Sequence, residues 1–97
     1  MKFAFISRHE PTDEQHALAE EQGIALTHVG DADAFTVSPA FVHDNGAYEG
    51  VVVVHPAAAM RLCSTFLVGV FENSTRPGLD DKPQFFAKSL HIFDMRD

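Results

Sequence analysis

The segment that decides the fold is Gly50–Cys63, whose sequence is GVVVVHPAAAMRLC. Four consecutive valines are typical of a strand that is buried on both faces, as in the interior of a parallel sheet. The strand is expected to end at His55-Pro56, and Ala57–Cys63 has the composition of a helix. A buried strand followed directly by a helix is the unit from which parallel sheets are built.

The same alternation continues on both sides of this segment. Further strands are expected at Lys2–Ile6, Ile24–Val29, Phe66–Phe71 and Leu90–Phe93, and helices at Thr12–Gln22 and from Ser38-Pro39 through Val42. Thr12 and Gln15 have the spacing of a capping box, and Gly23 suits the position after a helix. The segment Thr75–Pro83 is expected to be a loop with a turn at Pro77-Gly78.

This order of elements predicts an α/β fold with a Rossmann-like, mostly parallel sheet and flanking helices. The last strand can be antiparallel at an edge of the sheet. A chain of 97 residues has the length of one domain, so residues 1–97 are expected to form a single unit.

Composition limits the classes of function. Fourteen acidic residues against seven basic ones give a net charge of -7, which argues against a general coat for long nucleic acid. A small phosphorylated ligand in a local basic pocket is compatible with this charge. Cys63 is the one cysteine, so no intrachain disulfide is expected, and it fits a small core position. The chain lacks the pattern of a signal peptide or membrane span, which favours the cytoplasm.

Ligands of open α/β sheets bind outside the carboxyl ends of the strands. Four expected loops lie there: Ser7-Arg8-His9, Gly30-Asp31, His55-Pro56-Ala57 and Glu72-Asn73-Ser74. Their side chains suit the recognition of phosphate and ribose. A second interpretation stays open, in which Ser7, Asn73 and Ser74 are turn residues and His55 caps the helix that follows.

The helix after His55 is expected to receive the phosphate. Asp13 and Glu14 would repel an anion from the first helix, whereas the backbone amides of Ala57, Ala58 and Ala59 are expected to be open to one, with Arg8 opposite. A metal site and a cofactor are not expected, because the six histidines lack zinc-site spacing. Ser7 is not in the elbow motif of serine hydrolases, and a P-loop is missing.

Several of these features occur together in one family. They are Ser7-Arg8-His9 after the opening strand with a nearby proline, the helix exit Gln22-Gly23-Ile24, the segment His55–Cys63, and a loop with Arg76 and Leu79. In these features, which span most of the chain, the sequence resembles the small single-domain CRISPR-associated ring nucleases related to the CARF domain.

The resemblance implies a homodimer that binds cyclic tetra-adenylate across its two-fold axis. It also implies metal-independent cleavage, in which a ribose 2′-OH attacks the adjacent phosphorus and leaves a 2′,3′-cyclic phosphate, switching off type III CRISPR signalling. In that chemistry Arg8 would stabilise charge, and His9 or His55 would move a proton. The residues expected to bind the ligand are Ser7, Ala57, Ala58, Asn73 and Ser74.

Two other classes of function remain open at this point. One is a module of the same fold that binds a nucleotide without cleaving it. The other is a phage or plasmid accessory protein that acts through protein contacts, for which the acidic surface is an argument.

Overall fold

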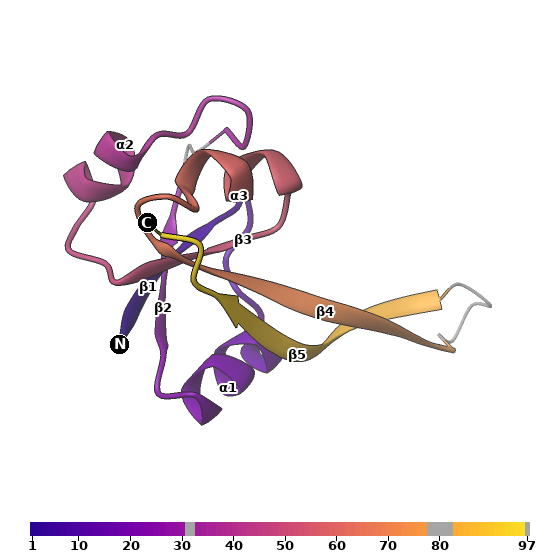
Figure 1. Ribbon diagram of the computed structural model, residues 1–97. Coiled ribbons are helices and arrows are strands. Elements are labelled where there is room, and N and C mark those ends of the chain that lie inside the picture. Colours follow the sequence, from indigo (N-terminus) through magenta and orange to yellow (C-terminus); the bar gives the residue numbers. More distant parts are fainter. Residues whose placement is uncertain (31–32, 78–82, 97) are drawn as a thin grey trace.

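The computed structural model describes residues 1–30, 33–77 and 83–96, and its centre is a five-stranded sheet of order β2-β1-β3-β4-β5 (Figure 1). The strands are β1 (Lys2–Ile6), β2 (Ala25–Val29), β3 (Gly50–Val53), β4 (Leu67–Pro77) and β5 (Pro83–Phe93). The first four run parallel, and β5 pairs antiparallel with β4 at the edge. The expected α/β class, mostly parallel sheet and antiparallel last strand are confirmed.

In the described part of the chain, three helices flank the sheet: α1 (Asp13–Glu21), α2 (Pro39–Asp44) and α3 (Pro56–Leu62). Helix α1 begins with the expected capping box. The hydroxyl of Thr12 accepts the backbone N–H of Gln15 at 3.2 Å, and Oε1 of Gln15 accepts the N–H of Thr12 at 2.8 Å. Ser38 caps α2, where Pro39 occupies the first turn. Local sequence therefore sets the start of both helices.

The order of the strands reverses between β1 and β3. The chain passes from β1 through α1 to β2 on one side, then returns through α2 to β3 on the other side of β1. With right-handed crossovers, this reversal puts α1 on one face and α2 and α3 on the other. Helices that diverge in this way leave a crevice outside the carboxyl ends of β1 and β3.

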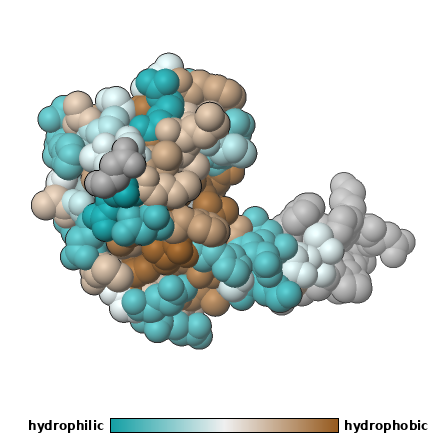
Figure 2. Space-filling view, in the orientation of Figure 1, coloured by the Kyte–Doolittle hydropathy of each residue, from teal (hydrophilic) through white to brown (hydrophobic). Residues whose placement is uncertain are grey.

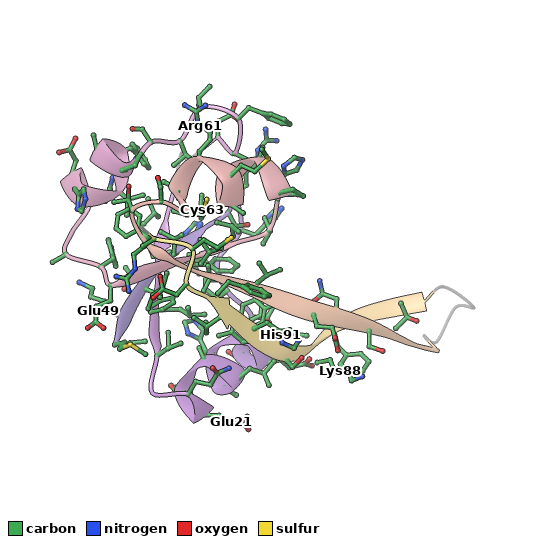
Figure 3. The ribbon with its side chains drawn as sticks, viewed as in Figure 1. Glu21, Glu49, Arg61, Cys63, Lys88 and His91 are labelled. Atoms are coloured by element: carbon green, nitrogen blue, oxygen red, sulfur yellow. The ribbon has the colours of Figure 1, made fainter. Side chains whose placement is uncertain are left out.

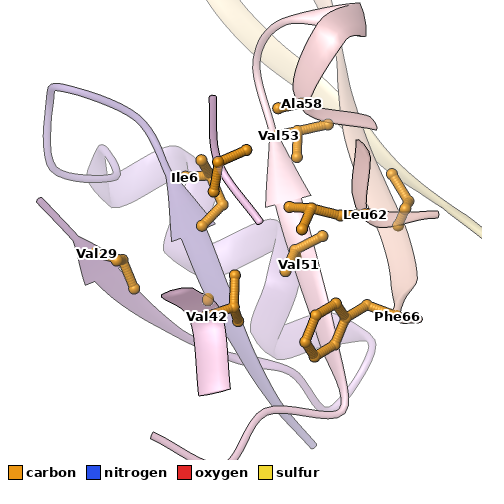
Figure 4. Packing of buried hydrophobic residues seen from close by; sticks show 11 residues of the cluster. Ile6, Val29, Val42, Val51, Val53, Ala58, Leu62 and Phe66 are labelled. Carbon is orange, nitrogen blue, oxygen red and sulfur yellow. The ribbon is translucent and has the colours of Figure 1, made fainter. Parts of the chain in front are cut away.

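The core has one cluster on each face of the sheet. On the face of α2 and α3, Ile6, Val51 and Val53 pack against Leu62 and Phe66 (Figure 4). On the α1 face the cluster contains Phe3, Phe5, Ala19, Val52, Phe71 and Leu90. Val51, Val52 and Val53 are all buried, so these three valines are covered on both faces as their composition predicts. The fourth valine of the run departs from this expectation, because Val54 follows the end of β3 and is 60% exposed.

Helix α1 holds the two edges of the sheet together. It packs against both β2 and β5, which lie at opposite edges. At its end, the side-chain amide of Gln22 donates to the carbonyl oxygen of Leu90 at 2.7 Å. The sheet therefore curls around α1, and the inner half of β5 is fixed against the body of the protein.

The expected end of the fourth strand is wrong. Strand β4 does not stop at Phe71 but runs to Pro77, and β5 starts at Pro83 instead of Leu90. Pairing continues to Pro77↔Pro83, with a bulge between Glu72 and Asn73. Each strand supplies backbone partners to the other, so polar residues stay extended here without being buried. Of the expected loop at Thr75–Pro83, the structure places Thr75–Pro77 and Pro83 in the paired strands. Residues 78–82, which include part of the expected turn at Pro77-Gly78, lie outside the described residues.

The ribbon formed by β4 and β5 projects from the body, as the space-filling view shows (Figure 2). Its root carries exposed charges. Glu72 lies 3.5 Å from Nζ of Lys88 and 3.6 Å from Nε2 of His91 (Figure 3). Exposed pairs of this kind contribute about 0–1 kcal/mol, so α1 and the strand pairing, rather than these charges, hold the ribbon in place.

Gly50 at the start of β3 provides a test of this packing. A Cβ there would lie 2.6 Å from Cε2 of Phe3 and 2.8 Å from the carbonyl oxygen of Leu67. We expect Gly50→Ala to lower the free energy of unfolding by about 1–3 kcal/mol, the usual cost of overpacking a core. Urea denaturation measures the change. Gly30→Ala is the matched control, because its nearest contact would be 4.0 Å away, and equal stability of the two variants would contradict the packing described here.

Candidate functional site

A cleft of about 350 Å³ opens outside the carboxyl ends of β1 and β3, where the strand order reverses. Residues from three connections line it: Ile6, Ser7, Arg8 and His9 after β1, Asp33, Ala34 and Phe35 after β2, and Val54 and His55 after β3. Four of the side chains expected at the site, those of Ser7, Arg8, His9 and His55, are therefore brought together.

The loop after β1 is held by two hydrogen bonds. Nε2 of His28 on β2 donates to the carbonyl oxygen of Ser7 at 2.7 Å, and the hydroxyl of Ser7 accepts the N–H of His9 at 3.2 Å. The hydroxyl proton of Ser7 remains available to a ligand. Arg8 and His9 are exposed, and within the described part of the chain Arg8 has no carboxylate partner. Its guanidinium is thus open to an anion.

His55 is the N-cap of α3, which agrees with the second interpretation of the sequence, in which His55 caps the helix that follows it. Its Nδ1 accepts the backbone N–H of Ala57 at 3.0 Å. A neutral imidazole that accepts at Nδ1 carries its proton on Nε2. The ring therefore presents a hydrogen-bond donor. It does not act as a proton donor while the cap is made, because loss of the Nε2 proton would leave an imidazolate.

The expectation of open amides at Ala57 and Ala58 is wrong. The N–H of Ala57 is bound by the ring of His55, and the N–H of Ala58 lies 3.1 Å from the carbonyl oxygen of His55. The capping side chain and the tight first turn of this seven-residue helix occupy the donors that a phosphate would need. Neither alanine lines the cleft.

Asn73 and Ser74 do not reach the cleft either. They lie within β4 beyond the bulge, because this strand continues past the sheet into the ribbon. Asn73 instead lines a separate hollow of about 290 Å³ with the start of α1, including Thr12 and Gln15. Gly30 does not line the cleft, and Asp31 lies outside the described residues.

Sequence reasoning missed the turn at Asp33–Val37. Oδ1 of Asp33 accepts the N–H of Phe35 at 2.8 Å, and its carbonyl oxygen accepts the N–H groups of Thr36 and Val37 at 3.0 and 2.8 Å. Phe35 is 66% exposed, and its ring centroid lies 4.9 Å from that of His55. The available signal was an aromatic residue a few positions beyond the end of an expected strand, in a segment of small and acidic residues.

The turn is also tied to α3. Nε of Arg61 donates to the carbonyl oxygen of Val37 at 2.7 Å, and Arg61 reaches this turn from the helix (Figure 3). The side chain of Val37 is buried in the core cluster. The turn that presents Phe35 is therefore anchored to the body of the protein at Val37.

Two further observations concern the described residues only. They contain no group of three or more His, Cys, Asp or Glu side chains arranged to hold a metal ion. Among them, too, no helix is long and apolar enough to cross a membrane.

Comparison with protein-family models, with curated proteins and with solved structures gave no match to this chain. The geometry of the cleft and the pattern of its residues therefore carry the functional argument.

The cap made by His55 can be tested apart from any activity. His55→Ala removes the acceptor for the N–H of Ala57 and is expected to lower the free energy of unfolding by about 1 kcal/mol. His55→Asn should retain most of the parental stability, because asparagine is a favoured N-cap residue. Urea denaturation compares the two variants. Equal losses would instead assign the stabilising role to the contact between the rings of His55 and Phe35.

Proposed function

We propose that the cleft binds a nucleotide phosphodiester and that the chain is a metal-independent ring nuclease for cyclic tetra-adenylate. One observation supports the binding part above all others. The guanidinium of Arg8, the ring of His9 and the donor of His55 meet at one cleft where the strand order reverses. The choice of ligand and reaction follows from the resemblance of Ser7-Arg8-His9 and His55–Cys63 to the CARF-related ring nucleases.

The proposed reaction uses the ring, water and side chains of the cleft. The ribose 2′-oxygen forms a bond to the adjacent phosphorus as its proton passes to His9, and the bond from phosphorus to the 5′-oxygen breaks. The departing 5′-oxygen takes a proton from water, and the resulting hydroxide takes back the proton that His9 received. The products are a 2′,3′-cyclic phosphate and a 5′-hydroxyl, and His9 returns to its starting state. Arg8 stabilises the charge that gathers on the phosphoryl oxygens. His55, whose Nδ1 caps α3, binds a ligand oxygen through Nε2–H.

The proposed assembly is a dimer. A volume of about 350 Å³ is near the lower end of the roughly 300–1000 Å³ of small-molecule sites, which suits one nucleotide unit but not a ring of four. A symmetric ring therefore calls for two clefts that face each other across a two-fold axis.

Binding without cleavage is the second candidate. It is favoured by the cap at His55, because His9 is then the one histidine lining the cleft within the described residues whose ring makes no such bond. A site with one proton-transfer group can bind a phosphodiester firmly and cleave it slowly. Analysis of the products after incubation with cyclic tetra-adenylate separates the two candidates.

Arg8 gives the sharpest test of the proposed reaction. Arg8→Ala should slow the cleavage of cyclic tetra-adenylate by about 10²- to 10³-fold, and Arg8→Lys should restore only part of the rate because the two-pronged geometry is lost. His9→Ala should cost about 10²-fold. The product is measured by chromatography under single-turnover conditions.

Matched controls are available for both residues. Arg96 pairs with Asp94 after β5, and His91 lies on the ribbon, so Arg96→Ala and His91→Ala change the same residue types away from the cleft. Both controls should cleave at the parental rate. Folded Arg8→Ala and His9→Ala variants that also cleave at the parental rate would refute the assigned roles.

The dimer is tested by sedimentation. At tens of micromolar protein, we expect a dimer in the presence of cyclic tetra-adenylate, since one cleft holds only part of the ring. A monomer both with and without the ring would contradict the symmetric site.

A further inference from the structure

We propose that the turn after β2 is the base-binding end of the cleft, with Phe35 as the platform on which a purine stacks and Asp33 as the acceptor for its 6-amino group. This inference rests on the proposed binding of a nucleotide in the same cleft. It adds which end of the cleft takes the base and which base is preferred.

Phe35 is exposed although its surroundings are fixed. The turn that carries it is held by three hydrogen bonds to Asp33 and by the bond from Arg61 to Val37. A large apolar side chain that is 66% exposed on such a rigid turn contributes little to the core. Aromatic side chains presented in this way are the usual platforms for nucleic-acid bases, because stacking on a prepositioned ring needs little further ordering.

The ring of His55 packs against Phe35, so a base would stack on the part of the Phe35 ring that His55 leaves exposed. The rings of Phe35 and His55 are inclined at 58°, with their centroids 4.9 Å apart. Because Nδ1 of His55 is bound to Ala57, the ring meets a ligand with its Nε2–H. A base stacked on Phe35 would therefore have its ribose oxygens next to a hydrogen-bond donor.

Charge sets the direction of the ligand. Arg8 and His9 come from the connection after β1, whereas Asp33 comes from the connection after β2. A phosphate is attracted to Arg8 and repelled by Asp33, so the phosphate lies toward Arg8 and the base lies toward the turn that carries Asp33 and Phe35.

Asp33 also selects the kind of purine. Its Oδ1 accepts the N–H of Phe35, and Oδ2 has no partner among the described residues. An ionised carboxylate only accepts hydrogen bonds. It therefore favours adenine, which presents a 6-amino donor, and disfavours hypoxanthine, which presents a 6-oxo acceptor.

The first experiment measures binding of AMP and of ribose 5-phosphate by calorimetry. The parent is expected to bind AMP more tightly, and Phe35→Ala should weaken AMP binding by roughly tenfold while leaving ribose 5-phosphate unchanged. Phe93→Ala is the matched control, because Phe93 is also about half exposed (49%) but lies on β5. Equal affinity of the parent for both ligands, no binding of AMP, or unchanged AMP binding by Phe35→Ala would each overturn the base platform.

The second experiment exchanges the recognition group. Asp33→Asn keeps an oxygen for the N–H of Phe35 and places an amide donor where Oδ2 stood. The preference for AMP over IMP in the parent should then reverse, with a change in the affinity ratio of about tenfold or more. A ratio that stays as in the parent would exclude Asp33 as the residue that reads the base.

These outcomes are separate from those that test the ring nuclease. If the parent protein binds AMP through Phe35 but leaves cyclic tetra-adenylate intact, the base site is supported and the proposed reaction is refuted. If the parent protein cleaves the ring but the Phe35→Ala variant binds AMP as tightly as the parent, the reaction is supported and the base site is refuted.

Discussion

Strand β3 has no face that solvent reaches, because Val51 and Val53 pack under α2 and α3 while Val52 packs toward α1. A strand with this sequence is stable only with helices on both sides of the sheet. Right-handed crossovers place helices on both sides only if the order of the strands reverses, with β2 added on one side of β1 and β3 on the other. The crevice at the carboxyl ends of β1 and β3 is thus a consequence of burying β3 on both faces. The cleft lies in this crevice.

Residues of the cleft stabilise the fold in addition to their proposed role in binding and cleavage. His55 caps α3 with one ring nitrogen and turns the other outward, and Ser7 orders its own loop through the N–H of His9. These bonds fix which atoms remain for a ligand. Because the same side chains are held by bonds within the fold, their remaining donors are positioned before any ligand arrives, and the cleft is preorganised.

The acidic charge of the chain is compatible with an anionic ligand because basic side chains line part of the cleft. Arg8 and His9 come from the connection after β1, whereas Asp33 comes from the connection after β2. In the proposed function, the net charge of -7 would keep long polyanions away, whereas Arg8 and His9 would accept a single phosphate. In the proposed function, this polarity selects a short nucleotide and sets its direction in the cleft.

The sequence by itself determined the parts of the structure that depend on near neighbours. The strand at Val51–Val53, the capping box at Thr12 and the Ser38-Pro39 start each depend on a few neighbouring residues, and all three formed as expected. The carboxyl-end rule also placed Ser7, Arg8, His9 and His55 at one rim. Only the tertiary structure decided the length of β4 and β5, because their outer halves are held by pairing with each other and not by a burial pattern. Asp33 and Phe35 reached the cleft through the turn tied down by Arg61 from α3, a contact between distant segments that no local pattern encodes. The same reason explains why the amides of Ala57 and Ala58 were closed, since the bonds that occupy them depend on the rotamer and position of His55 in the folded chain.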